Sequence, residues 1–210
     1  SLYNSYINPE LKIEKKKIKD EEHNMNISSI GLGFFIALIF LQGLGATKNF
    51  MKDKQLNTLD RIRISPVPSY QYISGYMVTY IIVLLIQIVF TILIVRYIIR
   101  IDFFMPFPLL FLICFCFGLS SIGTGLIIVA FTKSSTQAGY ITSFLFTPAC
   151  MLGGCYWPFH IMPPFLQRVS DLLPHKWAMD AFYKLQEGGD FFSIVLNLSI
   201  LLGFTLLLVL

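Results

Sequence analysis

Residues 153–190 read GGCYWPFHIMPPFLQRVSDLLPHKWAMDAFYKLQEGGD, and this stretch decides how the chain is organised. It lies between two long apolar segments but is too interrupted to cross a membrane as one helix. Its Gly-Gly start weakens the preceding helix, and Pro158, Pro163 and Pro164 prevent a helix from continuing through them. The stretch therefore predicts a chain that leaves the bilayer and turns.

The same stretch is too apolar to be a free loop. Its apolar side chains include Phe159, Ile161, Met162, Phe165, Leu166, Val169, Leu172 and Leu173. Irregular backbone at membrane depth persists only where protein buries it or where it lines a water-filled cavity. We expect short helical pieces that fold back against the membrane, and we interpret this re-entrant segment as the place for a gate.

The composition places the chain in a membrane. Of its 210 residues, 55% are hydrophobic and 13% are charged, and the mean hydropathy is +0.68. A soluble domain would carry roughly 25% charged residues. The net charge of +4 does not indicate nucleic-acid binding, because the basic residues flank apolar segments and form no stripe of their own.

Five apolar segments are long enough to cross a bilayer as helices, which takes roughly 20 residues. They cover about 28–46, 72–95, 107–131, 137–157 and 191–210. We therefore predict an all-α integral membrane protein, a polytopic helical bundle whose transmembrane domain covers residues 27–210.

The two ends of the sequence indicate a longer protein. Residues 1–26 are polar and highly charged and have no core of their own, so we interpret them as the end of an extramembrane segment. The sequence starts at Ser1 without a cleavable signal pattern and stops within an apolar run at Leu210. We expect a fragment that lacks material at both ends.

Charge alone leaves the orientation in the membrane open. The connections at 47–71 and 132–136 share one side and are basic, but the N-terminal lysines and the basic residues that follow the second and fourth spans share the other side. The positive-inside rule discounts long translocated segments, and 1–26 and 158–190 are both candidates for such segments.

The connection at 47–71 predicts a short amphipathic helix. Apolar residues recur every three positions between charged ones over 56–62, and Pro66 ends the helix before the next span. Two interpretations stay open. The helix is either a connector that binds lipid headgroups or a docking element for a cytoplasmic partner, with Asp60 and Arg61 as its polar handles.

The four cysteines are interpreted as small apolar packing residues. Cys114 and Cys116 lie inside an apolar run, whereas Cys150 and Cys155 lie beside the Gly-Gly break. None of them has the C-x-x-C spacing of a zinc or redox site. A Cys150–Cys155 disulfide would require that this end of the chain faces an oxidising compartment.

Two motifs carry a resemblance to a known family. Residues 55–62, QLNTLDRI, take the place of a family pattern E-x-G-T-L-E-R-L, and Ser65-Pro66-Val67 supplies the turn that follows it. The second motif is a Gly-rich turn, an aromatic-Pro pair and a proline-containing segment before the final span. Its residues here are Gly153, Gly154, Trp157, Pro158, Pro163, Pro164, Pro174, Asp180 and Ala181. From about residue 28 onward, the chain resembles the permease subunit of ABC-2 type ABC transporters, which export drugs, peptides, lipids or polysaccharides.

The resemblance implies a six-helix half-transporter in a bacterial plasma membrane, with five of its helices present here. It implies that 47–71 is cytoplasmic and couples to an ATPase through Gln55, Leu56, Thr58, Leu59, Asp60, Arg61 and Pro66. It also implies that 153–190 is the outer gate, formed by Gly153, Gly154, Trp157, Pro158, Pro163, Pro164 and Pro174. The implied partners are a cytoplasmic ABC ATPase, a second permease copy or a paralogue, and membrane lipids, but no nucleic acid.

The energy source is expected to lie in another subunit. No Walker-type G-x-x-x-x-G-K-[ST] pattern occurs in these 210 residues. We therefore expect a non-catalytic transport subunit that binds no cofactor itself, since the partner would bind ATP. In this hypothesis, closure of two ATPases pushes on 47–71 and on 132–136, and the transmembrane helices carry the movement to the outer gate.

Two other classes are weighed against this hypothesis. A channel or secondary transporter would be expected to carry ionisable residues within its spans, and none lies deep inside these segments. A membrane enzyme would need a carboxylate cluster or a nucleophile motif beside His160 or His175, and neither is present. Both histidines are therefore interpreted as interfacial packing residues, and His23 as a solvated one.

Overall fold

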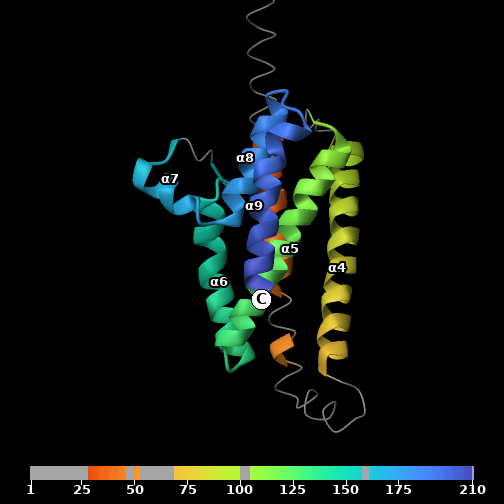
Figure 1. Cartoon of the computed structure of the whole chain (residues 1–210), viewed down its shortest axis with the longest axis vertical. Helices are drawn as coiled ribbons and strands as arrows, with labels where there is room; N and C mark the ends of the chain where they lie inside the picture. Colours follow the sequence, from red (N-terminus) through yellow and green to blue (C-terminus); the bar gives the residue numbers. More distant parts are fainter. Residues whose placement is uncertain (1–27, 46–49, 53–68, 100–104, 158–160, 210) are drawn as a thin grey trace, which may run out of the picture.

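The computed structural model describes residues 28–45, 50–52, 69–99, 105–157 and 161–209. All regular structure within these ranges is helical, and no strand occurs in them. The long helices run along the longest axis of the molecule (Figure 1). The predicted all-α, polytopic fold class is confirmed.

The first helix covers residues 28–45, and one further helical turn covers 50–52. The later elements are α4 (Ser69–Leu93), the π-helical turn η1 (Ile94–Ile99), α5 (Phe107–Phe131), α6 (Ser135–Leu152), α7 (Pro164–Ser170), α8 (Pro174–Gln186) and α9 (Phe191–Val209). Of the described helices, four are long and apolar enough to cross a membrane: the one that begins at Ser28, α4, α5 and α9. The helix α6 covers the fourth predicted span but is not among these four, because it is more polar.

The core forms where the first helix meets α5. Leu32, Ile36 and Ile39 of the first helix are fully buried, as is Phe117 of α5. By contrast, most of α4 and α9 is exposed in the single chain. Such apolar exposure is compatible with lipid or with another membrane helix, where no water has to be excluded.

The ring of Phe40 lies at the centre of this core. Its centroid is 6.4 Å from the ring of Phe117 in α5, 6.2 Å from that of Phe146 in α6 and 4.2 Å from that of His175 in α8. Aromatic pairs at these separations add a favourable edge-to-face or offset contribution to the burial of their surface. One side chain of the first helix therefore joins three later elements.

The elements divide between two ends of the bundle (Figure 1). The turn at 50–52, the start of α4 and the α5–α6 turn lie at the lower end in this view. The turn η1, the α7 helix and most of α8 lie toward the upper end, with α7 standing out to one side. The connections predicted to share a side, around 47–71 and 132–136, therefore do so in the structure where it describes them.

Prolines and glycines set the limits of the short helices. Pro164 and Pro174 are the first residues of α7 and α8, a position that needs no backbone N–H and suits a fixed φ. The prolines of the re-entrant segment thus start helices as well as interrupting them. Gly154 (φ 85°) and Gly188 (φ 87°) adopt the left-handed conformation that ends α6 and α8.

Candidate functional site

The predicted ATPase-coupling residues lie outside the described residues. They are Gln55, Leu56, Thr58, Leu59, Asp60, Arg61 and Pro66, and Pro158 and His160 of the predicted gate segment lie outside as well. Their roles therefore stay predictions. The structure does describe the elements to which the coupling segment is attached.

The turn at 50–52 packs on α4 at the lower end of the bundle. The rings of Phe50 and Tyr76 meet edge to face at 5.0 Å, and the hydroxyl of Tyr76 donates to that of Tyr80 at 3.0 Å. A small apolar pocket lies between these rings and α5, lined there by Ile122 and Val129 among others. Residues 50–52 are thus packed near both α4 and α5.

The α5–α6 turn at the same end is held by short hydrogen bonds. The hydroxyl of Thr132 donates to the carbonyl of Ile128 at 2.8 Å. The Ser134 hydroxyl accepts from the backbone N–H of Gln137, and the Gln137 side chain accepts from the N–H of Lys133, both at 3.1 Å. This reciprocal arrangement caps the start of α6. The turn is consequently a stiff connection between two long helices.

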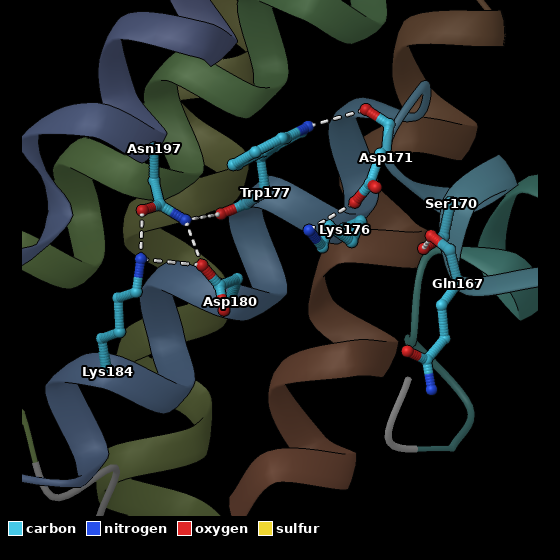
Figure 2. A network of polar contacts seen from close by, with 8 residues as sticks. All are labelled: Gln167, Ser170, Asp171, Lys176, Trp177, Asp180, Lys184 and Asn197. Atoms are coloured by element: carbon cyan, nitrogen blue, oxygen red, sulfur yellow. Dashed lines mark hydrogen bonds and ion pairs between the residues drawn. The ribbon is translucent and has the colours of Figure 1, made fainter. Parts of the chain in front are cut away.

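The α7 helix stands apart from the bundle at the upper end (Figure 1). Phe165 of this helix is 74% exposed, and Ile161 before it and Leu172 after it are 67% and 73% exposed. Its end is tied to α8, because the indole N–H of Trp177 donates to the carbonyl of Asp171 at 2.9 Å (Figure 2). The exposed apolar side chains are compatible with an element that lies against a membrane surface.

A polar network fastens α8 to α9 (Figure 2). The side-chain amide of Asn197 donates to the carboxylate of Asp180 at 2.8 Å and to the carbonyl of Trp177 at 3.0 Å. Its oxygen accepts from the ammonium of Lys184 at 2.9 Å, and Lys184 also pairs with Asp180 at 2.9 Å. Asn197 is fully buried, so each polar atom of its side chain needs such a partner.

The other end of α8 is fastened to the start of the first helix. The Gln186 side chain accepts from the hydroxyl of Ser29 at 2.8 Å and donates to that of Ser28 at 3.0 Å. The α8 helix is thus hydrogen-bonded both to α9 and to the first helix.

His175 lies inside the core, where its ring meets Phe40 and Phe117. It is only 1% exposed, so it is a packing residue as predicted, but it packs in the core of the chain. A side chain at Gly153 would meet it, because an added Cβ would lie 2.1 Å from the Cβ of His175. The predicted gate glycine thus permits close contact between the end of α6 and the start of α8.

One face of α6 carries exposed hydroxyl groups. Thr136, Tyr140, Ser143 and Thr147 are all exposed, and their spacing of three and four residues places them on one side of the helix. The first three of them line an open groove of about 330 Å³ together with Ser135 and Gly139. Polar groups on a membrane helix normally face protein or a water-filled cavity rather than lipid.

Sequence reasoning did not identify Asn197 or the hydroxyl face of α6 as functional features. The spacing of Thr136, Tyr140, Ser143 and Thr147 is visible in the sequence and could have indicated a polar face. Asn197 offered a weaker signal, a single amide in an apolar run. Its partners on α8 become apparent only from the way the two helices pack.

The chain is similar to known transport proteins. A family profile described as "ABC-2 type transporter" matches residues 10–186. The chain is 25% identical over 196 residues to the linearmycin resistance permease protein LnrN of Bacillus subtilis, an alignment covering 91% of this chain and 51% of that protein. It is 30% identical over 147 residues to a probable multidrug ABC transporter permease, YbhR, of Escherichia coli, covering 70% and 40%.

A eukaryotic protein is also similar. The chain is 23% identical over 164 residues to ABC transporter G family member 20 of Dictyostelium discoideum, covering 78% of this chain and 22% of that protein. The chain thus spans about half or less of the length of these relatives. No solved structure matches the chain significantly.

Proposed function

This chain belongs to the family of ABC-2 type transporters, and we propose that it forms the transmembrane permease subunit of an ATP-driven exporter. ATP would be hydrolysed by a separate cytoplasmic ABC ATPase that contacts the end of the bundle holding residues 50–52 and the α5–α6 turn. The likeness to permeases named for linearmycin resistance and multidrug transport supports an amphipathic cargo. A second copy or a paralogue would complete the route.

The hydroxyl face of α6 is the observation that carries this proposal. The single chain offers no cover for Tyr140, which is 73% exposed, although the helix belongs to a membrane-embedded bundle. In lipid, the hydroxyls of this face would lack partners other than their own backbone. We place this face along the export route, where water and cargo would contact it. It carries no charged side chain between 135 and 152, which suits a cargo that is polar but not strongly ionic.

The stiff elements at the lower end supply the coupling in this proposal. A push from the ATPase on residues 50–52 would reach α4 and α5 through Phe50 and Tyr76. A push on the α5–α6 turn would reach α6 through the capped residues around Ser134. The movement would then arrive at the turn after α6, next to the re-entrant segment.

Filling the groove on α6 is expected to weaken cargo recognition. The permease is purified with its ABC ATPase partner, reconstituted in liposomes, and its ATP hydrolysis is measured with panels of amphipathic drugs, peptides and lipids. Ser143→Trp should raise the cargo concentration that gives half-maximal stimulation by about tenfold, which corresponds to about 1.4 kcal/mol. The indole would occupy part of the groove that the cargo is proposed to contact.

Leu206→Trp is the matched control, since Leu206 is 64% exposed on the apolar face of α9. It should leave the stimulation unchanged. If Ser143→Trp and Leu206→Trp had equal effects on this stimulation, α6 would not line the export route. Transport that proceeds without any ATPase would favour the alternative of a channel or secondary transporter.

A further inference from the structure

The turn that ends α6 brings two cysteines together. Gly154 takes the left-handed conformation, and the backbone N–H of Cys155 donates to the carbonyl of Cys150 at 3.0 Å. The N–H of Gly154 donates to the carbonyl of Met151 at 3.3 Å. These two bonds define a Schellman motif, in which the residue after the left-handed glycine contacts the side chain five positions earlier. Here the residues at both of these positions are cysteines, and both carry free thiols in the structure.

His175 lies beside this turn. An added Cβ at Gly153 would be 2.1 Å from the Cβ of His175, and neither ring nitrogen of His175 has a hydrogen-bond partner among the described residues. Cys150, Cys155 and His175 are each at most 1% exposed. Among the described residues, no group of three or more His, Cys, Asp and Glu side chains is placed to hold a metal ion.

We propose that Cys150 and Cys155 form a reversible disulfide, with His175 as the base that activates Cys150. The oxidant is a small uncharged peroxide able to enter the packed turn. His175 takes the Cys150 proton, and the thiolate sulfur attacks a peroxide oxygen. The O–O bond breaks to give a sulfenic acid, and the leaving hydroxide takes the proton from His175 to become water. The Cys155 sulfur then displaces the sulfenic oxygen as a second water. Two thiols lose two electrons and two protons in total, and one hydrogen peroxide becomes two waters.

A Cys150–Cys155 disulfide would close a loop of six residues, 150–155, around the turn. That turn follows α6 and opens the re-entrant segment. The backbone carbonyl of Cys155, within this turn, also packs against the first helix at Gly33. The disulfide would lock the backbone at Gly154 in its present conformation. The reaction needs neither cargo nor ATPase, so its failure would leave the permease assignment untouched.

The chain supplies its own control for the test. Cys114 and Cys116 are also buried, at 0% and 4% exposure. They are two residues apart on α5 and therefore point to different sides of the helix, so they are unable to pair. If oxidation depended only on the entry of peroxide into the protein, Cys114 and Cys116 should be oxidised as fast as Cys150 and Cys155.

The test treats the purified full chain in nanodiscs with hydrogen peroxide. Free thiols are then blocked with one alkylating reagent, disulfides are reduced, and the released thiols are labelled with a second reagent for mass spectrometry. We expect Cys150 and Cys155 to become linked at least about tenfold faster than Cys114 or Cys116 is modified, because an adjacent base raises the thiolate fraction. A thiol reductant should restore both free thiols.

Two variants separate the chemistry from folding. Cys155→Ser removes one thiol with little change of volume, and Cys150 should then stop at a sulfenic acid that dimedone traps. His175→Gln should slow linkage by about tenfold while leaving Cys114 and Cys116 unaffected. The proposal would be overturned if Cys150 and Cys155 stayed free under these conditions. It would also be overturned if they reacted no faster than Cys114 and Cys116.

Discussion

Gly33→Ala is expected to prevent the chain from folding into a stable bundle. A Cβ at position 33 would lie 1.9 Å from the carbonyl oxygen of Cys155 and 2.7 Å from its carbonyl carbon. Both are main-chain atoms, so no side-chain rotation relieves the overlap, and the first helix would have to separate from the turn after α6. Overpacking of this kind costs on the order of 3 kcal/mol.

The first helix offers matched controls for this substitution. At Gly31 and Gly45, an added Cβ would meet no described atom within 4 Å beyond the backbone of its own helix, so alanine at either position should be tolerated and should favour the helix slightly. Gly43→Ala should behave like Gly33→Ala, because its Cβ would lie 2.6 Å from the Cβ of Ser121 and 2.7 Å from its carbonyl carbon.

The measurement is the thermal unfolding midpoint of purified protein, together with its yield as a monodisperse peak in size-exclusion chromatography. Gly33→Ala and Gly43→Ala should lose most of the peak, and Gly31→Ala and Gly45→Ala should keep it. If all four variants had the same thermal unfolding midpoint, the first helix would not be packed closely against α5 and the turn after α6.

Asn197→Leu is expected to release α8 from α9. Leucine has a similar volume but replaces none of the bonds to Asp180, Lys184 and the Trp177 carbonyl. The Asp180–Lys184 pair would survive, since its 2.9 Å contact does not involve Asn197. The loss of several bonds to a buried amide, two of them charge-assisted, should cost about 2–3 kcal/mol of unfolding free energy.

Ser199→Ala is the control for Asn197→Leu. Ser199 lies on the same helix but is exposed, and its hydroxyl donates only to the carbonyl of Val195 one turn earlier. Its removal should change stability by less than about 0.5 kcal/mol. Unfolding in denaturant, combined with a double-mutant cycle on Asn197 and Asp180, measures the coupling directly. A coupling energy near zero would mean that the network contributes nothing to holding α8.

The apolar runs made the helical architecture predictable. The sequence predicts a span at 107–131, and α5 occupies the same residues. The second predicted span, 72–95, corresponds to α4 and η1, which together reach from Ser69 to Ile99. Length and apolarity are properties of each segment alone, so they can be evaluated without knowing what lies beside it.

The details of the candidate site depend on contacts between segments, which the sequence does not display. The proline-rich stretch indicated a chain that turns, but Pro164 and Pro174 initiate helices, a role that depends on where the preceding turn ends. Asn197 finds its partners only because α8 packs against α9. Likewise, Cys150 and Cys155 come together at one turn because Gly154 is left-handed, a conformation that the Gly-Gly pair permits but does not impose.

In the proposed orientation, the end of the bundle with α7 faces outward and the α5–α6 turn faces the cytoplasm. Cysteine labelling in intact cells tests this orientation most directly. Native cysteines are all buried, at 4% exposure or less, so they should give little background. One variant carries Phe165→Cys on α7, where the side chain is 74% exposed, and another carries Lys133→Cys in the α5–α6 turn. With a membrane-impermeant maleimide, we expect Phe165→Cys to be labelled in intact cells and Lys133→Cys only after permeabilisation. The reverse pattern would contradict this orientation.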